Sequence, residues 1–359
     1  MRWFLFVAAV LAGLTAVSSV ISARDKESKW NLPPSQTNRN MSVPERERLE
    51  KIPTTAAISA HRDGYLHVLD EDGTNVRQIS FETPQGAWEH VAVSPDRRFI
   101  AANEQMPNPA SKPGGVSRLW LFDTVQGTRT RLVPAFDTAG NGGVDWDRNG
   151  FIYFAAKEKD IVAQPQTPAD FRANAGENDI YRIKYDGTGL QRLTHSKSYG
   201  EADVSVSEDG AMIAYANLNI LEEVMEIWAA AADGSGARMV FKGGKPRISS
   251  VHDPELSPDN KFIVFSRVNH GVPPNFPNNP DANTAHDIYR LNLSSGEMLR
   301  LTRPGHISIV PDWVGDKVLF LDISERERYA GLATVAPDKP DQAPHVIVTN
   351  MNIGKWIPR

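Results

Sequence analysis

The sequence Asp287-Ile288-Tyr289-Arg290-Leu291 runs into Leu299-Arg300-Leu301-Thr302, and the chain contains this phrase twice. The earlier copy is Asp179-Ile180-Tyr181-Arg182-Ile183, which runs into Leu190-Gln191-Arg192-Leu193-Thr194. Both copies read as a short strand, a turn and a second strand. Short strands that recur with a period of about 40 to 60 residues are typical of an array of four-stranded units. The repeated phrase therefore predicts a β-propeller.

Each repeat also contains an inner hairpin, in which an apolar anchor ends the first strand and a tight polar turn leads to a second apolar strand. Ser94-Pro95-Asp96 and Ser257-Pro258-Asp259 are two of these turns, and such turns require residues like Asp, Asn, Pro and Gly. The anchors are Val93, Trp146, Val206, Leu256 and Trp313. We predict that Trp146 and Trp313 are buried between blades, because they stand where other repeats have Val or Leu.

Outer hairpins complete the repeats, and their alternating pattern is that of half-buried strands. Six segments start them: residues 65–69, 118–122, 180–183, 226–228, 288–291 and 331–335. Only five inner hairpins are complete, so the tail Met351–Pro358 is expected to pair with Ala56–Ala60, which removes an open sheet edge. The sequence therefore predicts an all-β fold, a six-bladed β-propeller of four-stranded antiparallel blades that is closed by a terminal strand.

The N-terminus has the pattern of a secretory signal. Arg2 precedes an apolar run from Trp3 to Val20, and Ile21-Ser22-Ala23 follows, whose Ser22 and Ala23 are typical of a small-residue cleavage site. We predict a signal peptide at 1–23, a polar linker at 24–53 and the β-propeller at 54–359. The apolar run is close to the ~18 residues that suffice to span a membrane, so an uncleaved anchor is the alternative. Either way, the propeller is expected outside the cytoplasm, as a periplasmic or secreted protein.

Composition narrows the possible partners and chemistry. The chain has 44 acidic and 39 basic side chains and no basic stripe, so no nucleic-acid partner is expected. It contains no cysteine, which excludes disulfides, thiolate metal sites and a cysteine nucleophile. Membrane contact is expected only through an uncleaved N-terminal segment.

The repeats resemble the WD40-like repeat of the periplasmic TolB propeller family, in which a Ser-Pro-Asp-Gly turn, an apolar strand, Asp-Ile-Tyr-Arg and Leu-Thr follow one another. The resemblance covers roughly residues 54–350. It implies the propeller fold and a location in the cell envelope. The family's namesake also has an N-terminal α/β domain, for which residues 24–53 leave no room, so its role in envelope assembly is not implied. Related propeller peptidases need a Gly-x-Ser-x-Gly elbow, which this sequence lacks.

In a propeller, the loops that lead into the innermost strands converge on the central channel. Their polar residues are expected to line the channel mouth and to bind a ligand: Glu89, His90, Glu201, Asp203, His252, Asp253 and His306. Imidazole and carboxylate bind divalent metals. The candidate metal ligands His90, His252 and His306 loosely resemble the central metal sites of some propeller-fold polysaccharide lyases. The alternative is that these side chains hydrogen-bond backbone groups and hold water. No other cofactor is expected.

Long insertions follow the second inner strand in three repeats, at residues 104–116, 157–178 and 268–286. Loops of this length are uncommon without a purpose, although loops also drift between relatives. We expect them to form the walls of a groove on the channel face, where Trp88, Phe171 and Phe276 offer apolar contacts for a partner or a sugar ring. The sequence thus predicts an exported scaffold that binds a protein or peptide partner in the cell envelope at this face. The alternative is a metal-assisted lyase or hydrolase that acts on a carbohydrate polymer at the central channel.

Overall fold

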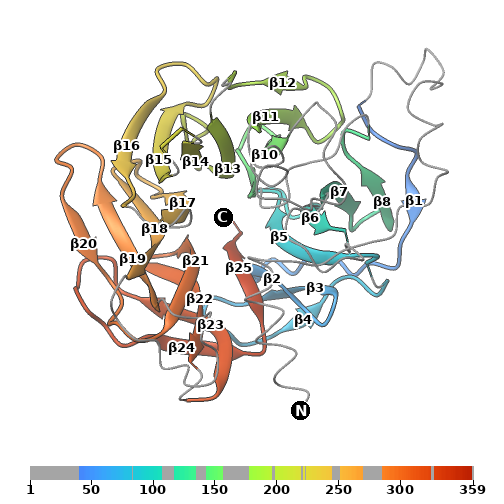
Figure 1. Cartoon of the computed structure of the whole chain (residues 1–359). Coiled ribbons are helices and arrows are strands. Elements are labelled where there is room, and N and C mark those ends of the chain that lie inside the picture. The colour runs from blue at the N-terminus through green and yellow to red at the C-terminus, as the bar shows by residue number, and fades with distance from the viewer. Residues whose placement is uncertain are drawn as a thin grey trace, which may run out of the picture.

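The computed structural model describes most of the chain, and its regular elements there are all β-strands (Figure 1). The described residues are 40–82, 84–106, 117–134, 143–156, 178–195, 199–219, 221–222, 224–244, 251–269, 285–324 and 327–357. None of them belongs to a helix long and apolar enough to cross a membrane. The all-β prediction is confirmed for this part of the chain, and the predicted signal peptide at 1–23 lies outside it.

Three of the five sheets consist of four strands each. The first has the order β25 (Asn352–Trp356), β2 (Ile58–Arg62), β3 (Tyr65–Leu69) and β4 (Arg77–Gln78). The second has the order β12 (Gln191–Arg192), β11 (Asp179–Lys184), β10 (Phe151–Ala156) and β9 (Val144–Trp146). The third has the order β13 (Tyr199–Val206), β14 (Met212–Asn219), β15 (Val224–Ala231) and β16 (Arg238–Lys242).

Two further sheets are larger. One has the order β1 (Glu45–Arg46), β8 (Thr128–Arg131), β7 (Ser117–Asp123), β6 (Phe99–Gln105) and β5 (Ala87–Val93). The other is eight-stranded and contains β17 (Val251–Leu256), β18 (Phe262–Asn269), β19 (Ala285–Asn292), β20 (Met298–Arg300), β21 (Ile307–Val314), β22 (Lys317–Ser324), β23 (Tyr329–Val335) and β24 (His345–Thr349).

The prediction of six separate four-stranded antiparallel blades is therefore wrong, because the described strands form five sheets and only three of these have four strands. The eight-stranded sheet exists because His286 at the start of β19 pairs in parallel with Ile307 of β21. The backbone N–H of His286 also donates to the carbonyl of His306, at 3.1 Å. The hydrogen-bonded ladder thus continues where the sequence pattern predicted a break. The repeat pattern in the sequence predicts the strands, but it does not predict the backbone pairing that joins β19 to β21.

The expected closure by the C-terminal tail is confirmed. Strand β25 pairs antiparallel with β2, with Trp356 opposite Ile58 and Lys355 opposite Ser59. The inner strands β25, β5, β9, β13, β17 and β21 each contact the next, and β21 contacts β25 again. Figure 1 shows them around the centre of the molecule, with the outer strands of each sheet farther out. The ring is therefore closed by a strand from the end of the chain.

The repeated phrase forms a hydrogen-bond network within the outer hairpin. The hydroxyl of Thr302 accepts from the N–H of Ile288 at 3.0 Å and donates to Asp287 at 3.1 Å. Thr194 contacts Ile180 and Asp179 in the same way, at 2.9 and 3.2 Å. All of these groups are buried, so the hydroxyl gives a hydrogen-bond partner both to a backbone N–H and to a carboxylate inside the protein. This network is why Asp and Thr recur about 15 residues apart.

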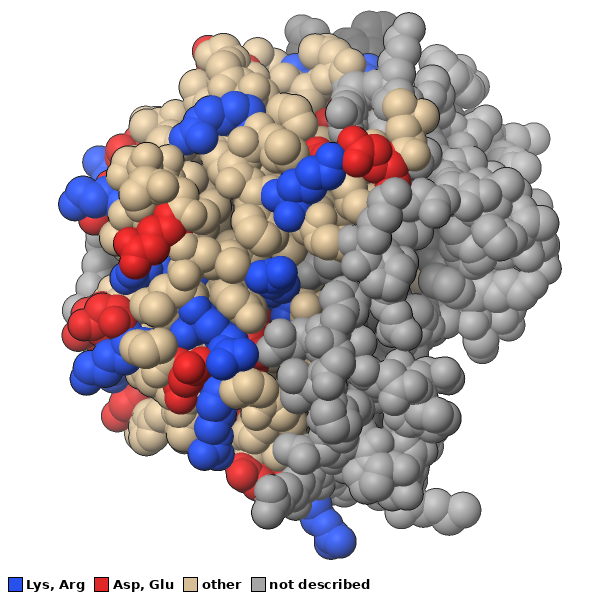
Figure 2. Space-filling view, turned by 60° about the vertical axis from the view of Figure 1, so that its left-hand side comes forward, with Lys and Arg blue, Asp and Glu red and all other residues tan. Residues whose placement is uncertain are grey.

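The arginine of the phrase connects one repeat to the next. Arg290 stacks on Phe262, 4.4 Å from the ring centroid, and donates to the carbonyl of Pro337 at 2.8 Å. Arg182 stacks on Phe151 and donates to the carbonyl of Ala232 at 3.1 Å. A guanidinium can serve both contacts because it is planar and carries several donors. Elsewhere on the surface, basic and acidic side chains are interspersed, as the face in Figure 2 shows.

Residues 40–53, in the predicted linker, lie along the outer strands. Strand β1 adds a fifth strand to β8, with Glu45 opposite Arg129. The N–H of Asn40 donates to Gly187 at 3.1 Å, and that of Glu50 donates to Ile79 at 2.9 Å. This segment covers outer strand edges that would otherwise be open. The boundary at residue 54 stays a prediction.

The two anchor tryptophans are buried, as predicted, with 3 % of Trp146 and 7 % of Trp313 exposed. Each indole N–H reaches the inner strand of the preceding repeat: Trp146 donates to Ala92 at 3.1 Å, and Trp313 to Glu255 at 3.4 Å. Each tryptophan thus joins two neighbouring inner strands.

We expect Trp146→Ala and Trp313→Ala each to lower the free energy of unfolding by about 3–5 kcal/mol, because a large side chain leaves a packed interior. Urea unfolding followed by circular dichroism measures this. The matched control is Trp228→Ala, since Trp228 is only half-buried and should cost less. Equal costs at all three positions would contradict the interior role.

We also expect deletion of residues 351–359 to lower the thermal unfolding temperature strongly. The deletion removes β25 and the buried side chains of Met351 and Ile357, and leaves β2 without its partner. The control is His345→Ala, an exposed change on the outer strand β24. An unchanged melting temperature after the deletion would show that the ring does not depend on its last strand.

Candidate functional site

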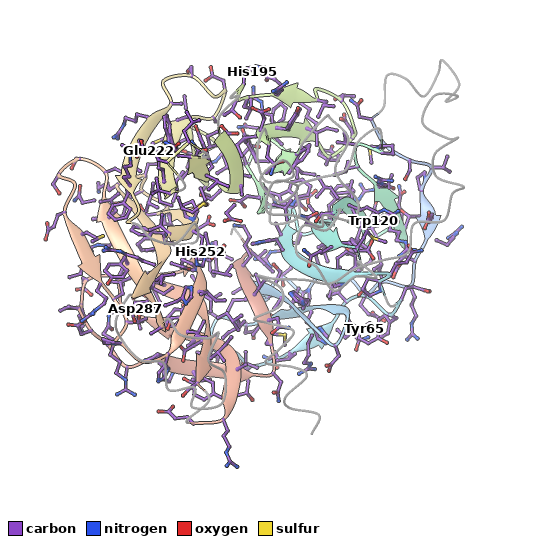
Figure 3. The ribbon with its side chains drawn as sticks, in the orientation of Figure 1. Tyr65, Trp120, His195, Glu222, His252 and Asp287 are labelled. Atoms are coloured by element: carbon purple, nitrogen blue, oxygen red, sulfur yellow. The ribbon has the colours of Figure 1, made fainter. Side chains whose placement is uncertain are left out.

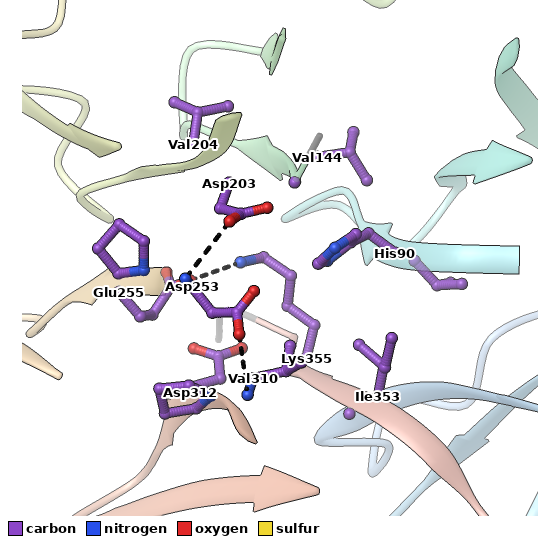
Figure 4. A pocket seen from close by; sticks show the side chains of 15 residues that line it. His90, Val144, Asp203, Val204, Asp253, Glu255, Val310, Asp312, Ile353 and Lys355 are labelled. Carbon is purple, nitrogen blue, oxygen red and sulfur yellow. Dashed lines mark hydrogen bonds and ion pairs between the residues drawn. The ribbon is translucent and has the colours of Figure 1, made fainter. Parts of the chain in front are cut away.

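The channel side chains are positioned by bulges in the inner strands. Pairing shifts between Ala202 and Ser205 in β13, and at the equivalent places in β17 and β21. Within these bulges Asp203, Asp253 and Val310 have positive φ angles of 49°, 53° and 50°. A bulge bends its strand and redirects a side chain. Here three successive inner strands turn the same repeat position toward the channel (Figure 4).

These bulges border a small cavity at the centre of the ring (Figure 4). Its volume is ≈ 20 Å³, which is room for about one water molecule. Its polar lining comes from different inner strands: His90, Asp203, Asp253, Glu255, Asp312 and Lys355. Among the described residues, this cavity therefore has no room to enclose a substrate.

Below the mouth, Lys355 of the closing strand meets carboxylates from other strands. Its ammonium lies 2.9 Å from Glu255 and 3.4 Å from Asp145. Asp312 accepts a hydrogen bond from the N–H of Trp356, at 2.5 Å. Three repeats thus place a carboxylate next to the residue that the last strand contributes.

Burial and mutual charge shift the pKa values of this cluster. Burial raises the pKa of Asp312 to about 6, against the opposing effect of Lys355. Burial also raises the pKa of Asp145, and that of Glu255 well above its ordinary value. Burial alone would lower the pKa of Lys355, but the three carboxylates outweigh it and raise that pKa. The cluster therefore contains a charged lysine beside three carboxyl groups, those of Asp145, Glu255 and Asp312, which keep their protons to a higher pH than exposed carboxyl groups do.

At the mouth, Asp203 and Asp253 come from adjacent inner strands. Asp253 lies 2.5 Å from Nδ1 of His252 and accepts from the N–H of Val310 at 3.3 Å. The N–H of Asp253 donates to Asp203 at 3.5 Å. Burial, assisted by the charge of Asp253, raises the pKa of Asp203 well above its ordinary value.

The two histidines at the mouth differ. Burial alone would lower the pKa of His252, but the carboxylate of Asp253 raises it. Burial would conversely raise the pKa of Asp253, but His252 holds it low. Burial lowers the pKa of His90 to about 4, with Asp253 opposing. His252 is therefore paired with a carboxylate, whereas His90 is a neutral imidazole.

The predicted mouth residues are only partly brought together. His90, Asp203 and Asp253 line the cavity, and His252 pairs with Asp253 close to the centre (Figure 3). His306 instead bonds Asp322 at 2.8 Å. The other predicted residues are Glu201, which is buried in β13 outside the cavity lining, and Glu89, whose side chain lies outside the described part.

The network around His306 is separate from the cavity. Asp322 accepts from Nδ1 of His306 and from the hydroxyl of Tyr329, and from Ser308 at 2.7 Å. The hydrogen bond to Asp322 raises the pKa of His306. Across the described residues, no group of three or more His, Asp or Glu side chains is placed to hold a metal ion. The metal set His90, His252 and His306 stays a prediction.

The prediction that Trp88 offers an apolar contact to a partner is wrong. Trp88 is 4 % exposed, packs against Phe122 with ring centroids 5.6 Å apart, and donates to the carbonyl of Gly64. It belongs to the core because the strand β5 turns it inward, away from a partner. Phe171 and Phe276 lie outside the described residues.

The sequence analysis missed the lysine–carboxylate cluster. Its signal was present, because Asp145, Glu255 and Asp312 each immediately precede an anchor residue. Lys355 stands in the same place before Trp356 on the closing strand. Aligning the tail with the other inner strands would have shown one lysine among three acids at one level of the channel.

Comparison with known proteins supports the fold. No family model matches the sequence, and no curated protein matches it. A putative TolB from Agrobacterium tumefaciens superposes with a TM-score of 0.55 at 13% identity, covering 85% of this chain and 99% of that one. The chain has a TolB-like β-propeller fold.

Two further structures match over most of this chain. A chain of a nidogen/laminin complex gives a TM-score of 0.53 at 11% identity, covering 84% of this chain and 98% of that one. TolB from Acinetobacter baumannii gives 0.49 at 14% identity, covering 85% of this chain and 66% of that one. At these identities the likeness shows the fold alone.

We expect Lys355→Met to lower the free energy of unfolding by about 3–5 kcal/mol at pH 8, because it leaves buried carboxylates without their cation. The loss should shrink at pH 5. A carboxyl with a raised folded-state pKa stabilises while protonated and loses that contribution as pH rises through its pKa, about 6 for Asp312. Urea midpoints at both pH values measure this.

The matched control is Lys261→Met, which breaks an exposed pair with Asp259 at 2.9 Å. Exposed pairs contribute about 0–1 kcal/mol, so this change should be small at both pH values. A loss for Lys355→Met that does not depend on pH would contradict the carboxylate account.

Proposed function

We propose that this protein is an exported scaffold that binds a protein or peptide partner at the channel mouth. The observation that carries the proposal is the cavity: it lies at the centre of the ring and has only ≈ 20 Å³ of free volume. A partner on this face therefore rests on the rim and inserts no more than a slender group.

The long insertions support the same face. Strand β6 ends at Gln105, which pairs with Ala87 at the start of β5. Arg267 near the end of β18 likewise pairs with Val251 at the start of β17. The second inner strands β6 and β18 thus end beside the starts of β5 and β17, at the mouth. Residues 107–116, 157–177 and 270–284 lie outside the described part.

The compartment is part of the proposal. The apolar N-terminal run is the pattern of an export signal, and the TolB-like fold is consistent with a role in the cell envelope. A propeller supports binding and catalysis alike, so the fold by itself does not decide between them.

Site-specific photo-crosslinking in the cell envelope tests the proposal. A photoreactive residue replaces Gln85, which is exposed in the loop before β5. The matched control replaces Lys261, exposed in the turn between β17 and β18 at the opposite end. We expect a discrete protein adduct from position 85 and none from position 261.

Two results would overturn it. Adducts that are absent at position 85, or equal at both positions, contradict a partner at the mouth. Stoichiometric zinc or manganese in the purified protein, lost together with a catalytic activity on a carbohydrate polymer in His90→Ala, would favour the metal-assisted enzyme instead.

A further inference from the structure

We infer that residues 40–50 form a strap that docks on the outer edge of β8 at acid pH and is released as the pH rises, and that Glu47 controls the release. This inference does not depend on a partner at the channel mouth. It follows from three features of the strap: its weak hold on the ring, the surroundings of Glu47, and the strand edge that it covers.

The strap buries little of itself against the ring. Strand β1 is two residues long and pairs with β8 at the rim of the molecule (Figure 1). The N–H of Glu47 donates to the carbonyl of Gly127 at 3.0 Å. Met41 and Leu49 are partly buried against the core, and within residues 40–50 Glu47 alone is fully buried. A segment with so few buried side chains can leave the ring while the rest stays folded.

Glu47 is buried without full compensation of its charge. Its Oε2 lies 3.6 Å from Nε of Arg129 and accepts no hydrogen bond. The same Nε instead donates to Glu45 of the strap, at 3.1 Å. Glu82, in the segment after β4, adds a further negative charge, although its backbone N–H donates to the Glu47 carboxyl. One guanidinium thus faces three carboxyl groups, and it does not hydrogen-bond the buried one.

These surroundings make the docked strap favour a protonated Glu47. Burial raises the pKa of Glu47 to about 7; the charge of Arg129 opposes this shift, and the charges of Glu82 and Glu45 add to it. A carboxyl with a raised pKa stabilises the docked state fully below its ordinary pKa of 4.5 and loses that contribution as the pH rises to the docked pKa. Docking therefore weakens between these two values.

Release bares the outer edge of β8. In the docked strap, Glu45 lies opposite Arg129, and the hydroxyl of Ser42 accepts from the N–H of Arg131 at 2.8 Å. Without the strap these backbone groups of β8 face solvent, and an open strand edge can pair with another strand. The strap thus decides whether this edge is available.

The experiment uses the absence of cysteine from the chain. A nitroxide label on Val43→Cys of the full-length protein reports the motion of the strap, because Val43 is 66 % exposed and its label should not disturb docking. We expect EPR spectra from pH 5 to 8.5 to show a mobile component that grows with pH. Since one proton is involved, the ratio of released to docked strap should rise by up to about tenfold per pH unit and level off above about pH 7.

Two further substitutions in the labelled protein assign the effect. Glu47→Gln keeps the shape of the side chain and removes its titration, so the strap should stay docked at every pH. The matched control is Glu45→Gln, which removes an exposed acid paired with the same Arg129 and should leave the pH dependence in place. Thermal unfolding followed by circular dichroism shows that each variant is folded.

Three results would overturn the inference: a spectrum that does not change with pH, a mobile component that shrinks as the pH rises, and a pH dependence that persists in Glu47→Gln. A strap that is released at every pH in Glu47→Gln would also contradict it, because the uncharged side chain should dock. None of these results affects the crosslinking at position 85, so the proposed function is tested separately.

Discussion

Lys355 is the residue on which the centre of this protein depends. The last strand brings it into the channel, where Glu255 lies 2.9 Å and Asp145 3.4 Å from its ammonium. The same strand closes the ring by pairing with β2. Closure and charge compensation are therefore one event: without the strand the ring has an open edge, and without the lysine its carboxylates have no buried cation. The position of Lys355 in the channel thus follows from the position of the closing strand β25.

This arrangement also limits what the channel can do. Because the lysine and its carboxylates fill the lower part, only ≈ 20 Å³ remains free beneath the mouth. A propeller with a wide channel can enclose a ligand, but this one presents a shallow polar opening. The bulges place Asp203 and Asp253 between strand segments that pair with β14 and β18. The centre of this face is consequently an opening lined by carboxyl groups from several inner strands.

Much of the fold was predictable because local hydrogen bonds repeat with the sequence. Thr302 and Asp287 must recur together since a buried hydroxyl and carboxylate satisfy each other and the backbone. The closing strand was predictable by counting hairpins. The number of sheets was not, because the bridge between His286 and Ile307 is a single backbone contact that no side-chain pattern records. Only some of the residues expected at the mouth were predicted correctly. His90 and Asp253 line the central cavity, whereas His306 pairs with Asp322 outside it.

The strands, their turns and the apolar anchors follow from local sequence, since they depend on side chains close together along the chain. Which polar residues share a cavity depends instead on contacts between repeats that are distant in sequence. Lys355 and Asp145 are far apart in sequence and meet only when the ring closes. Trp88 looked available to a partner and proved to be core, because neighbouring strands cover it. Burial and charge at the channel arise from the joining of distant repeats, and that joining is a property of the closed ring.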